Sequence, residues 1–169
     1  MEKNFESLDV GCGLNFKGKV NLDRYKKINP EINQFKNINI NVHKIPNFIL
    51  ADALYLPFRN FSFKIIYCYH VIEHVKNPNK LIQELKRICT KNGIINIKCP
   101  HRFSKNAKMP YHKHYFTIIW FNKKFKKNIF HVDISLTYWY PIPFVGFRLK
   151  DEITIRIKRK GAGRFAKRS

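Results

Sequence analysis

Three aspartates and two glycines stand at the ends of short apolar runs, where they could bind an adenosine group. Asp9, Gly11 and Gly13 belong to the segment DVGCG, in which glycines let backbone N–H groups approach a ligand closely. Asp23 ends a second run and can accept hydrogen bonds from both hydroxyls of a ribose. Asp52 follows a third run and can accept one from the adenine amino group. Each alone is commonly a turn or cap residue, but together and in this order they favour an adenosine ligand.

The glycine segment does not match two common phosphate-binding patterns. The dinucleotide fingerprint GxGxxG fails because Phe16 stands at its third glycine position and the next glycine is Gly18. No GK[ST] sequence follows, as a P-loop requires. The segment therefore predicts neither of these sites.

A second group of chemically active residues lies in the segment 70–74 (HVIEH), which has the HxxEH spacing of an inverted zinc-protease motif. That motif needs a helix that presents both imidazoles to one metal ion, whereas His70 closes an apolar run that predicts a strand. We therefore expect no metal here. Glu73 and His74 are expected to form hydrogen bonds that hold the loop after this strand.

A further histidine cluster follows the fifth apolar run, where an acceptor pocket is expected to open. An imidazole there could take a proton from an acceptor hydroxyl or amine, could bind a metal, or could simply lie on the surface. The histidines are His101, His112 and His114, and the nearby aromatic residues are Tyr111, Tyr115, Phe116, Trp120 and Phe121. These aromatic rings suit the stacking of a planar acceptor, although such residues more often belong to a core.

The apolar runs predict the elements that position these residues. Buried strands are expected at 7–11, 19–22, 47–51, 63–69 and 94–99, and an antiparallel pair at 129–138 and 152–158, joined by the turn-forming segment 140–147. Residues 24–46 alternate Ile with Asn without a stable period and are expected to be mostly loop. This order indicates an open α/β sheet that binds its ligand at the carboxyl ends of the strands.

One helix is clearly indicated between the fourth and fifth strands. Asn77 can cap it and Pro78 suits its first turn. Its apolar positions recur at helical spacing: Leu81, Ile82, Leu85, Ile88 and Cys89. Gly93 is expected to end it as a C-cap. A shorter helix is expected around 117–126.

The chain resembles the class I S-adenosylmethionine-dependent methyltransferases, in particular their type 11 branch. The resemblance rests on LDVGCG (8–13), Asp23, ADALYLPF (51–58), the run 61–78 that contains the segment EHV, and the helix-to-strand segment 81–100. It covers about the first 100 residues. It implies a Rossmann-like sheet, mostly parallel, with a C-terminal antiparallel strand pair.

The resemblance also implies roles for individual residues, with S-adenosylmethionine as the cofactor. The methionine part of the cofactor would meet Asp9, Gly11, Cys12 and Gly13; the ribose Asp23; the adenine Asp52 and Ala53; and the reacting sulfonium Tyr69 and His70. The chain departs from most relatives because only residues 14–22 separate the glycine segment from Asp23, too few for a helix and a strand. A short variant of the branch shares this link.

The implied reaction transfers a methyl group to an acceptor that the sequence does not name. Positioning and exclusion of water can supply most of the acceleration of such a displacement. If one residue acts as a base, His70 is the first candidate and His101 the second. The sequence YCYH at 67–70 replaces the Asn/Asp-Pro-Pro-Tyr signature of enzymes that methylate exocyclic amines of bases, which argues against adenine-N6 chemistry.

Charge points to a second class of function. The chain contains 33 Lys and Arg against 11 Asp and Glu, a net charge of +22, of which residues 1–100 carry +8 and residues 101–169 carry +14. Such an excess attracts RNA or another polyanion, although AT-rich coding could also supply lysine. The alternative is therefore a non-catalytic nucleic-acid-binding protein on a methyltransferase fold, which would use 123–127 and 156–169.

Length and composition suit one domain. We expect a methyltransferase domain at 1–157, with a cofactor-binding half at 1–100, an acceptor side and sheet edge at 101–157, and a basic tail at 158–169. The sequence has no apolar run long enough for a membrane span and opens without a signal-peptide pattern, which predicts a cytoplasmic protein. The four cysteines form no CxxC pair and are expected to be free thiols.

Overall fold

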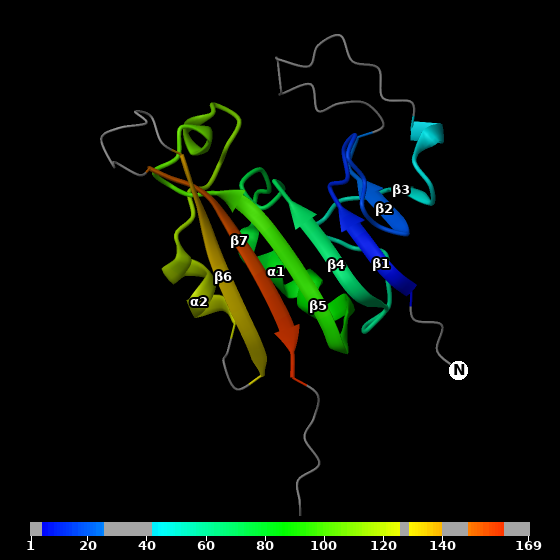
Figure 1. Cartoon of the computed structure of the whole chain (residues 1–169). Coiled ribbons are helices and arrows are strands. Elements are labelled where there is room, and N and C mark those ends of the chain that lie inside the picture. Colours follow the sequence, from blue (N-terminus) through cyan, green and yellow to red (C-terminus); the bar gives the residue numbers. More distant parts are fainter. Residues whose placement is uncertain (1–4, 26–41, 126–128, 140–148, 161–169) are drawn as a thin grey trace, which may run out of the picture.

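The computed structural model describes residues 5–25, 42–125, 129–139 and 149–160. The strands are β1 (Phe5–Val10), β2 (Val20–Asp23), β3 (Phe48–Leu50), β4 (Phe63–Tyr69), β5 (Cys89–Pro100), β6 (Phe130–Trp139) and β7 (Leu149–Arg159). The helices are α1 (Pro78–Ile88) and α2 (Ile118–Lys124), with short 3-10 turns η2 (Val42–Lys44) and η3 (Asn106–Lys108) (Figure 1).

The strands form one seven-stranded sheet in the order β3-β2-β1-β4-β5-β7-β6. The neighbours from β3 to β5 are parallel, whereas β7 is antiparallel to both β5 and β6. The expected mostly parallel sheet with a C-terminal antiparallel pair is confirmed. The carboxyl ends of the parallel strands therefore meet at one edge, toward the top of Figure 1.

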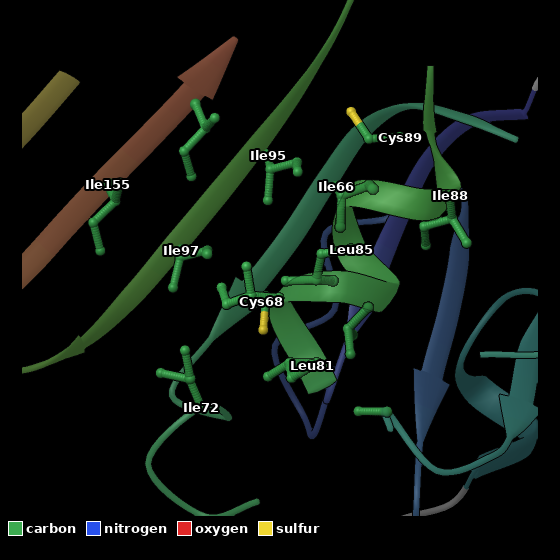
Figure 2. Close-up of a cluster of buried hydrophobic side chains, with 14 of the residues drawn as sticks. Ile66, Cys68, Ile72, Leu81, Leu85, Ile88, Cys89, Ile95, Ile97 and Ile155 are labelled. Atoms are coloured by element: carbon green, nitrogen blue, oxygen red, sulfur yellow. The ribbon is translucent and has the colours of Figure 1, made fainter. Parts of the chain in front are cut away.

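One face of the sheet carries the hydrophobic core. Isoleucines and cysteines of β4, β5 and β7 alternate toward α1, whose buried residues Leu81, Leu85 and Ile88 face them (Figure 2). The α2 residue Phe121 belongs to the same cluster. The Nζ of Lys86 donates a hydrogen bond to the backbone oxygen of Lys124, so α1 and the end of α2 lie side by side.

Within the described ranges, no helix covers the opposite face of the sheet, which we call the open face. Figure 1 shows this face in front, with α1 behind the strands. Across β4, β5 and β7, Tyr67 pairs with Asn96 and Asn96 with Arg156, which places these side chains on one face. They are half-buried or exposed, unlike their neighbours along each strand. This polar open face is typical of a sheet with one solvated side.

Helix α1 begins as the sequence predicts, but it ends earlier. The side chain of Asn77 accepts a hydrogen bond from Lys80 N at 3.0 Å, and Pro78 occupies the first turn. The prediction that Gly93 ends the helix is wrong, because the helix ends at Ile88 and Gly93 lies within β5. Thr90–Gly93 form an irregularity opposite Lys64, and a Cβ on Gly93 would lie 2.6 Å from Cys89 Sγ. A close approach, and not a helix end, therefore requires this glycine.

The other elements largely match the sequence analysis. Helix α2 lies in the range expected for the shorter helix, and the Thr117 side chain caps it. The predicted loop 24–46 falls mostly outside the described residues, as do the turn 140–147 and the tail from 161 onward. All four cysteines are buried free thiols, and burial raises the pKa of Cys12 to about 12. In the described part of the chain, no helix is long and apolar enough to cross a membrane.

The link between β1 and β2, residues 11–19, contains no helix. Hydrogen bonds attach it to the open face of β1. The Ser7 hydroxyl accepts a hydrogen bond from Lys19 N at 3.0 Å, and Asp9 Oδ2 accepts one from Lys17 N at 2.8 Å. Because the link covers them, Ser7 is only 7% and Asp9 only 3% exposed. The short link expected from the sequence is confirmed, and polar side chains replace the hydrogen bonds of a helix.

Asn21, in the middle of β2, organises the same link. Its Nδ2 donates to Gly18 O at 3.0 Å and to Pro46 O at 2.8 Å, while its Oδ1 accepts from Gly18 N at 3.1 Å. The residue is fully buried. At Gly18 the chain passes so close to β1 that an added Cβ would lie 2.5 Å from Asp9 N and 2.3 Å from Val20 O. The link therefore requires both residues.

We predict that Gly18→Ala lowers the free energy of unfolding by about 3 kcal/mol, because its Cβ meets backbone atoms that cannot move aside. Gly13→Ala is the matched control. Gly13 has a positive φ of 49° but open space around its missing Cβ, so it should cost only about 1 kcal/mol of backbone strain. Urea denaturation of both variants measures the difference, and equal losses would contradict this account of the link.

The buried Asp9 predicts a pH-dependent stability. Burial raises the pKa of its carboxyl to about 6, against the opposing hydrogen bond from Lys17 N. Between pH 4 and 6 the folded state therefore binds more protons than the unfolded state, and the Asp9 contribution to stability falls as pH rises. Asp9→Asn keeps an acceptor for Lys17 N without the charge.

At pH 7.5 we therefore expect Asp9→Asn to be more stable than the unmodified protein by up to about 3 kcal/mol, the equivalent of the pKa shift. The advantage should shrink at pH 4.5. Chemical denaturation at both pH values tests this, and a variant that is less stable at pH 7.5 would show that the ionised carboxylate stabilises the link.

Candidate functional site

The glycine turn follows β1 directly. Gly11 and Gly13 have φ values of 71° and 49°, in the left-handed region that favours glycine. The backbone N–H groups of Gly11 and Cys12 donate to Leu22 O at 2.7 and 3.1 Å, which joins the turn to β2. A Cβ on Gly11 would lie 2.3 Å from Val71 Cγ2, whereas one on Gly13 would meet nothing within 4 Å. The turn is thus packed on one side and open on the other.

Asp23, the last residue of β2, holds this turn in place. Its Oδ2 accepts a hydrogen bond from Gly13 N at 3.0 Å, and its Oδ1 accepts one from Tyr25 N at 3.1 Å. An ionised carboxylate can accept about four hydrogen bonds, so capacity for ligand hydroxyls remains. The two residues predicted for neighbouring parts of one ligand are therefore in direct contact.

Asp52 and Ala53 follow β3, which neighbours β2. Ala51 N donates to Asp23 O at 3.0 Å, continuing the contact between the two strand ends. Asp52 Oδ1 accepts from Leu54 N at 2.8 Å, and Ala53 is buried against the core. Two aspartates thus stand at adjacent carboxyl ends of the sheet, as the sequence predicts.

Two residues of α1 clamp the loop that carries Asp52. Glu84 Oε2 accepts from Leu56 N at 3.0 Å, and Arg87 donates to Phe58 O at 2.6 Å and to Leu56 O at 3.0 Å. The two side chains also pair at 2.8 Å, and this bond lowers the pKa of the Glu84 carboxyl. The cap and the apolar spacing that predict this helix do not indicate the clamp. Their spacing of three residues on one helix face is the available signal.

His70 lies at the end of β4 with a φ of 56°, a strained value for a residue other than glycine. Its Nδ1 is 3.4 Å from Glu73 Oε1, and its Nε2 is 3.0 Å from Glu152 Oε2. The nearby Glu73 carboxylate is the main influence that raises the pKa of this imidazole, against desolvation and with help from Glu152. The ring is half exposed. Glu152 comes from β7, a partner that local sequence patterns could not indicate.

Tyr69 precedes His70 and lies among basic side chains. The Nζ atoms of Lys17 and Lys98 lie 5.6 and 5.3 Å from its ring centroid, within the range of a cation–π contact. Lys17 belongs to the link between β1 and β2, and its Nζ also donates to Asn15 O at 3.0 Å. The link therefore reaches the end of β4.

The structure places His101 inside the fold. Its side chain is 3% exposed, its backbone N donates to Asp151 O at 2.8 Å, and its Nδ1 accepts from Phe103 N at 3.3 Å. Its backbone forms an isolated β-bridge with that of Phe116, which belongs to the core cluster. The expected acceptor pocket does not open around His101, so its ring has no access to an acceptor at the surface.

The segment 70–74 is not helical, as predicted, so it does not form the HxxEH zinc motif. Glu73 and His74 instead meet His112, and one ligand atom from each lies within 4.8 Å of the others. The third residue of the predicted histidine cluster, His114, lies 3.0 Å from Val75 O through its Nε2. Of the aromatic residues nearby, Phe116 and Phe121 are core, whereas Tyr115 is exposed.

A basic hollow lies at the opposite end of the strands from the glycine turn. Its lining residues are Asn92, His131, Lys158, Arg159 and Lys160. Asn92 stands near the start of β5 and Arg159 at the end of the antiparallel β7. The hollow therefore does not adjoin the carboxyl ends where the candidate site residues gather.

Comparisons with known proteins agree with this geometry. The family model described as a methyltransferase domain matches residues 8–97. An uncharacterised protein of Methanocaldococcus jannaschii is 35% identical over 95 residues, which are 54% of this chain and 39% of that protein. Ajmaline N-methyltransferase of Rauvolfia serpentina is 30% identical over 105 residues, 53% of this chain and 34% of that protein.

A solved structure of an S-adenosylmethionine-dependent methyltransferase from Thermotoga maritima has the same fold. It superposes with a TM-score of 0.63 at 18% identity, over 92% of this chain and 82% of that one. The chain spans a little over a third of the length of the curated relatives named above. The family model covers more than half of the 169 residues. The chain belongs to the methyltransferase domain family.

Proposed function

We propose that this protein is an S-adenosylmethionine-dependent methyltransferase whose cofactor lies across the carboxyl ends of β1, β2 and β3. The observation that carries the proposal is the hydrogen bond from Gly13 N to Asp23 Oδ2 at 3.0 Å. It joins the glycine turn to the acid at the end of β2. The contact forms even though this chain lacks the helix that most relatives have between these two parts of the site. Family membership supports the same assignment.

The residues present suit the groups of the cofactor. The open side of Gly13 leaves room for the methionine part beside the backbone of 11–13. Asp23 has acceptor capacity for the ribose hydroxyls, and Asp52 and Ala53 lie one strand further for the adenine. The Cys12 thiol stays neutral here, because burial raises its pKa to about 12, and the Cys12 N–H holds the turn through Leu22 O.

Asp9 takes a different role in this proposal from the one that the family resemblance implies. Its carboxylate accepts a hydrogen bond from Lys17 N and is 3% exposed beneath the link. We therefore assign Asp9 to positioning of the link. Lys17 in turn brings an ammonium group beside Tyr69, where it can pair with the cofactor carboxylate in place of the missing helix N-terminus.

When bound, the cofactor supplies an electrophilic methyl group. The acceptor would take this methyl group by displacement, with the cofactor sulfur as the leaving group. In this proposal, Tyr69 and His70 at the end of β4 lie beside the reacting methyl group. Both ring nitrogens of His70 face carboxylates, Nδ1 that of Glu73 and Nε2 that of Glu152, and these stabilise the imidazolium form. His70 can therefore take the proton that the acceptor releases once one nitrogen leaves its carboxylate partner. We retain His70 and not the buried His101 as the candidate base.

The ribose assignment predicts that Asp23→Ala weakens cofactor binding about 10- to 100-fold, the equivalent of losing hydrogen bonds to a charged acceptor. Equilibrium dialysis with labelled S-adenosylmethionine measures the affinity, and circular dichroism checks the fold. Asp23→Asn keeps one acceptor for Gly13 N and separates loss of charge from loss of the turn. Asp133→Ala, an exposed carboxylate on β6, is the control. A folded Asp23→Ala variant with unchanged affinity would contradict the assignment.

A second candidate function rests on the open face of the sheet. The rows Tyr67–Asn96–Arg156 and Tyr69–Lys98–Thr154 place aromatic and basic side chains on that face, and Lys158 lies in the next row. Bases stack on aromatic rings and phosphates pair with such cations. We propose that single-stranded RNA lies along this face, as acceptor or as partner.

This proposal predicts that Arg156→Ala/Lys158→Ala reduces the salt dependence of RNA binding. Each lost phosphate contact should lower the slope of log affinity against log salt by about 0.7. Fluorescence anisotropy with an oligonucleotide at several salt concentrations measures the slope. Lys123→Ala/Lys124→Ala, at the end of helix α2 on the covered face, is the charge-matched control. An equal slope for the double variant and the control would exclude the open face as the RNA site.

A further inference from the structure

A carboxylate and two imidazoles converge just beyond the end of β4. Glu73 and His74 belong to the loop that follows the strand, and His112 belongs to the segment between η3 and α2. One ligand atom of each residue lies within 4.8 Å of the other two. The rings of His74 and His112 meet at an angle of 68° with centroids 4.8 Å apart. Three potential metal ligands thus come from two separate segments.

The Glu73 carboxylate is buried and lacks the hydrogen bonds that such a group normally accepts. The residue is 1% exposed, and within the described part of the chain neither carboxylate oxygen accepts a hydrogen bond. His70 Nδ1 lies 3.4 Å from Oε1, but the His70 ring is itself half exposed and also contacts Glu152. Buried carboxylates are normally hydrogen-bonded, paired or bound to a metal. Oε1 of Glu73 thus has one distant imidazole partner, and Oε2 is available to a cation.

Both imidazoles contact a backbone carbonyl oxygen through Nδ1. His74 Nδ1 lies 3.4 Å from Tyr111 O, and His112 Nδ1 lies 3.2 Å from Ala107 O. A carbonyl oxygen only accepts hydrogen bonds, so these contacts place the proton on Nδ1 and leave the lone pair on Nε2. Backbone carbonyls commonly orient metal ligands in this way.

We propose that Glu73, His74 and His112 bind one divalent transition-metal ion, with further coordination positions left open. Two imidazole nitrogens and one carboxylate suit zinc and neighbouring first-row metals, whereas magnesium and calcium prefer oxygen ligands. This metal binding does not depend on methyl transfer. Its consequence for catalysis rests on the proposed function: an oxygen-bearing acceptor could complete the coordination beside His70 and be activated there.

Cobalt(II) is the direct probe, because its absorption spectrum reports protein ligands. We expect the metal-free protein, purified without a histidine tag, to bind one equivalent of Co²⁺ with visible d–d bands that Zn²⁺ abolishes. His74→Ala and His112→Ala should each weaken binding by at least about 10-fold. His131→Ala, an exposed histidine on β6, is the matched control and should bind like the unmodified protein.

Glu73→Gln keeps the proposal testable even if the histidine variants unfold. The substitution removes the carboxylate charge but keeps the shape of the side chain, so it should weaken Co²⁺ binding about 10-fold while circular dichroism shows an unchanged fold. A Glu73 that only pairs with His70 would leave Co²⁺ binding unchanged. Full-strength binding in His74→Ala or His112→Ala, or no bands in the unmodified protein, would overturn the site. Binding of S-adenosylhomocysteine, measured on the same preparation, distinguishes this failure from failure of the proposed methyltransferase function.

Discussion

The fastening of the link between β1 and β2 is the constraint on which the rest of this structure depends. Too few residues connect the strands for a helix, so the backbone groups of the link need other partners. Asp9 and Asn21 supply them, and Gly18 lets the chain pass directly over β1. This arrangement sets where β2 ends, and Asp23 from that end holds Gly13. The candidate adenosine site therefore depends on polar contacts where a helix would otherwise supply its own hydrogen bonds.

The adenine side of the candidate site is stabilised by α1, from the covered face of the sheet. The Glu84–Arg87 pair of α1 fixes the loop 51–58 through its backbone, so the position of Asp52 depends on a helix that occurs later in the chain. The antiparallel β7 contributes Glu152 to the surroundings of His70. The cofactor-binding and acceptor sides are thus joined through one sheet, and changes in β7 are expected to affect the end of β4.

Local patterns predicted most elements because their causes are local. Helix α1 follows from its apolar spacing and the Asn77 cap, and β4 from one apolar run. Gly93 was misassigned because a glycine after a helical pattern normally ends the helix, whereas here it relieves a close approach within β5. Asn21 and the meeting of Glu73 with His112 could not be predicted, since they depend on segments far apart in sequence. The strand-end aspartates were predictable because parallel strands bring their carboxyl ends together.

Calorimetric titration of the purified protein with S-adenosylhomocysteine at pH 7.5 tests the central claim most directly, because it needs no knowledge of the acceptor. The account predicts binding at a ratio of one to one, with an affinity in about the micromolar range. Such binding would show that the short link preserves the site that Gly13 and Asp23 form. Absence of binding by the folded, nucleic-acid-free protein would contradict the account and favour RNA binding on the open face as the main function.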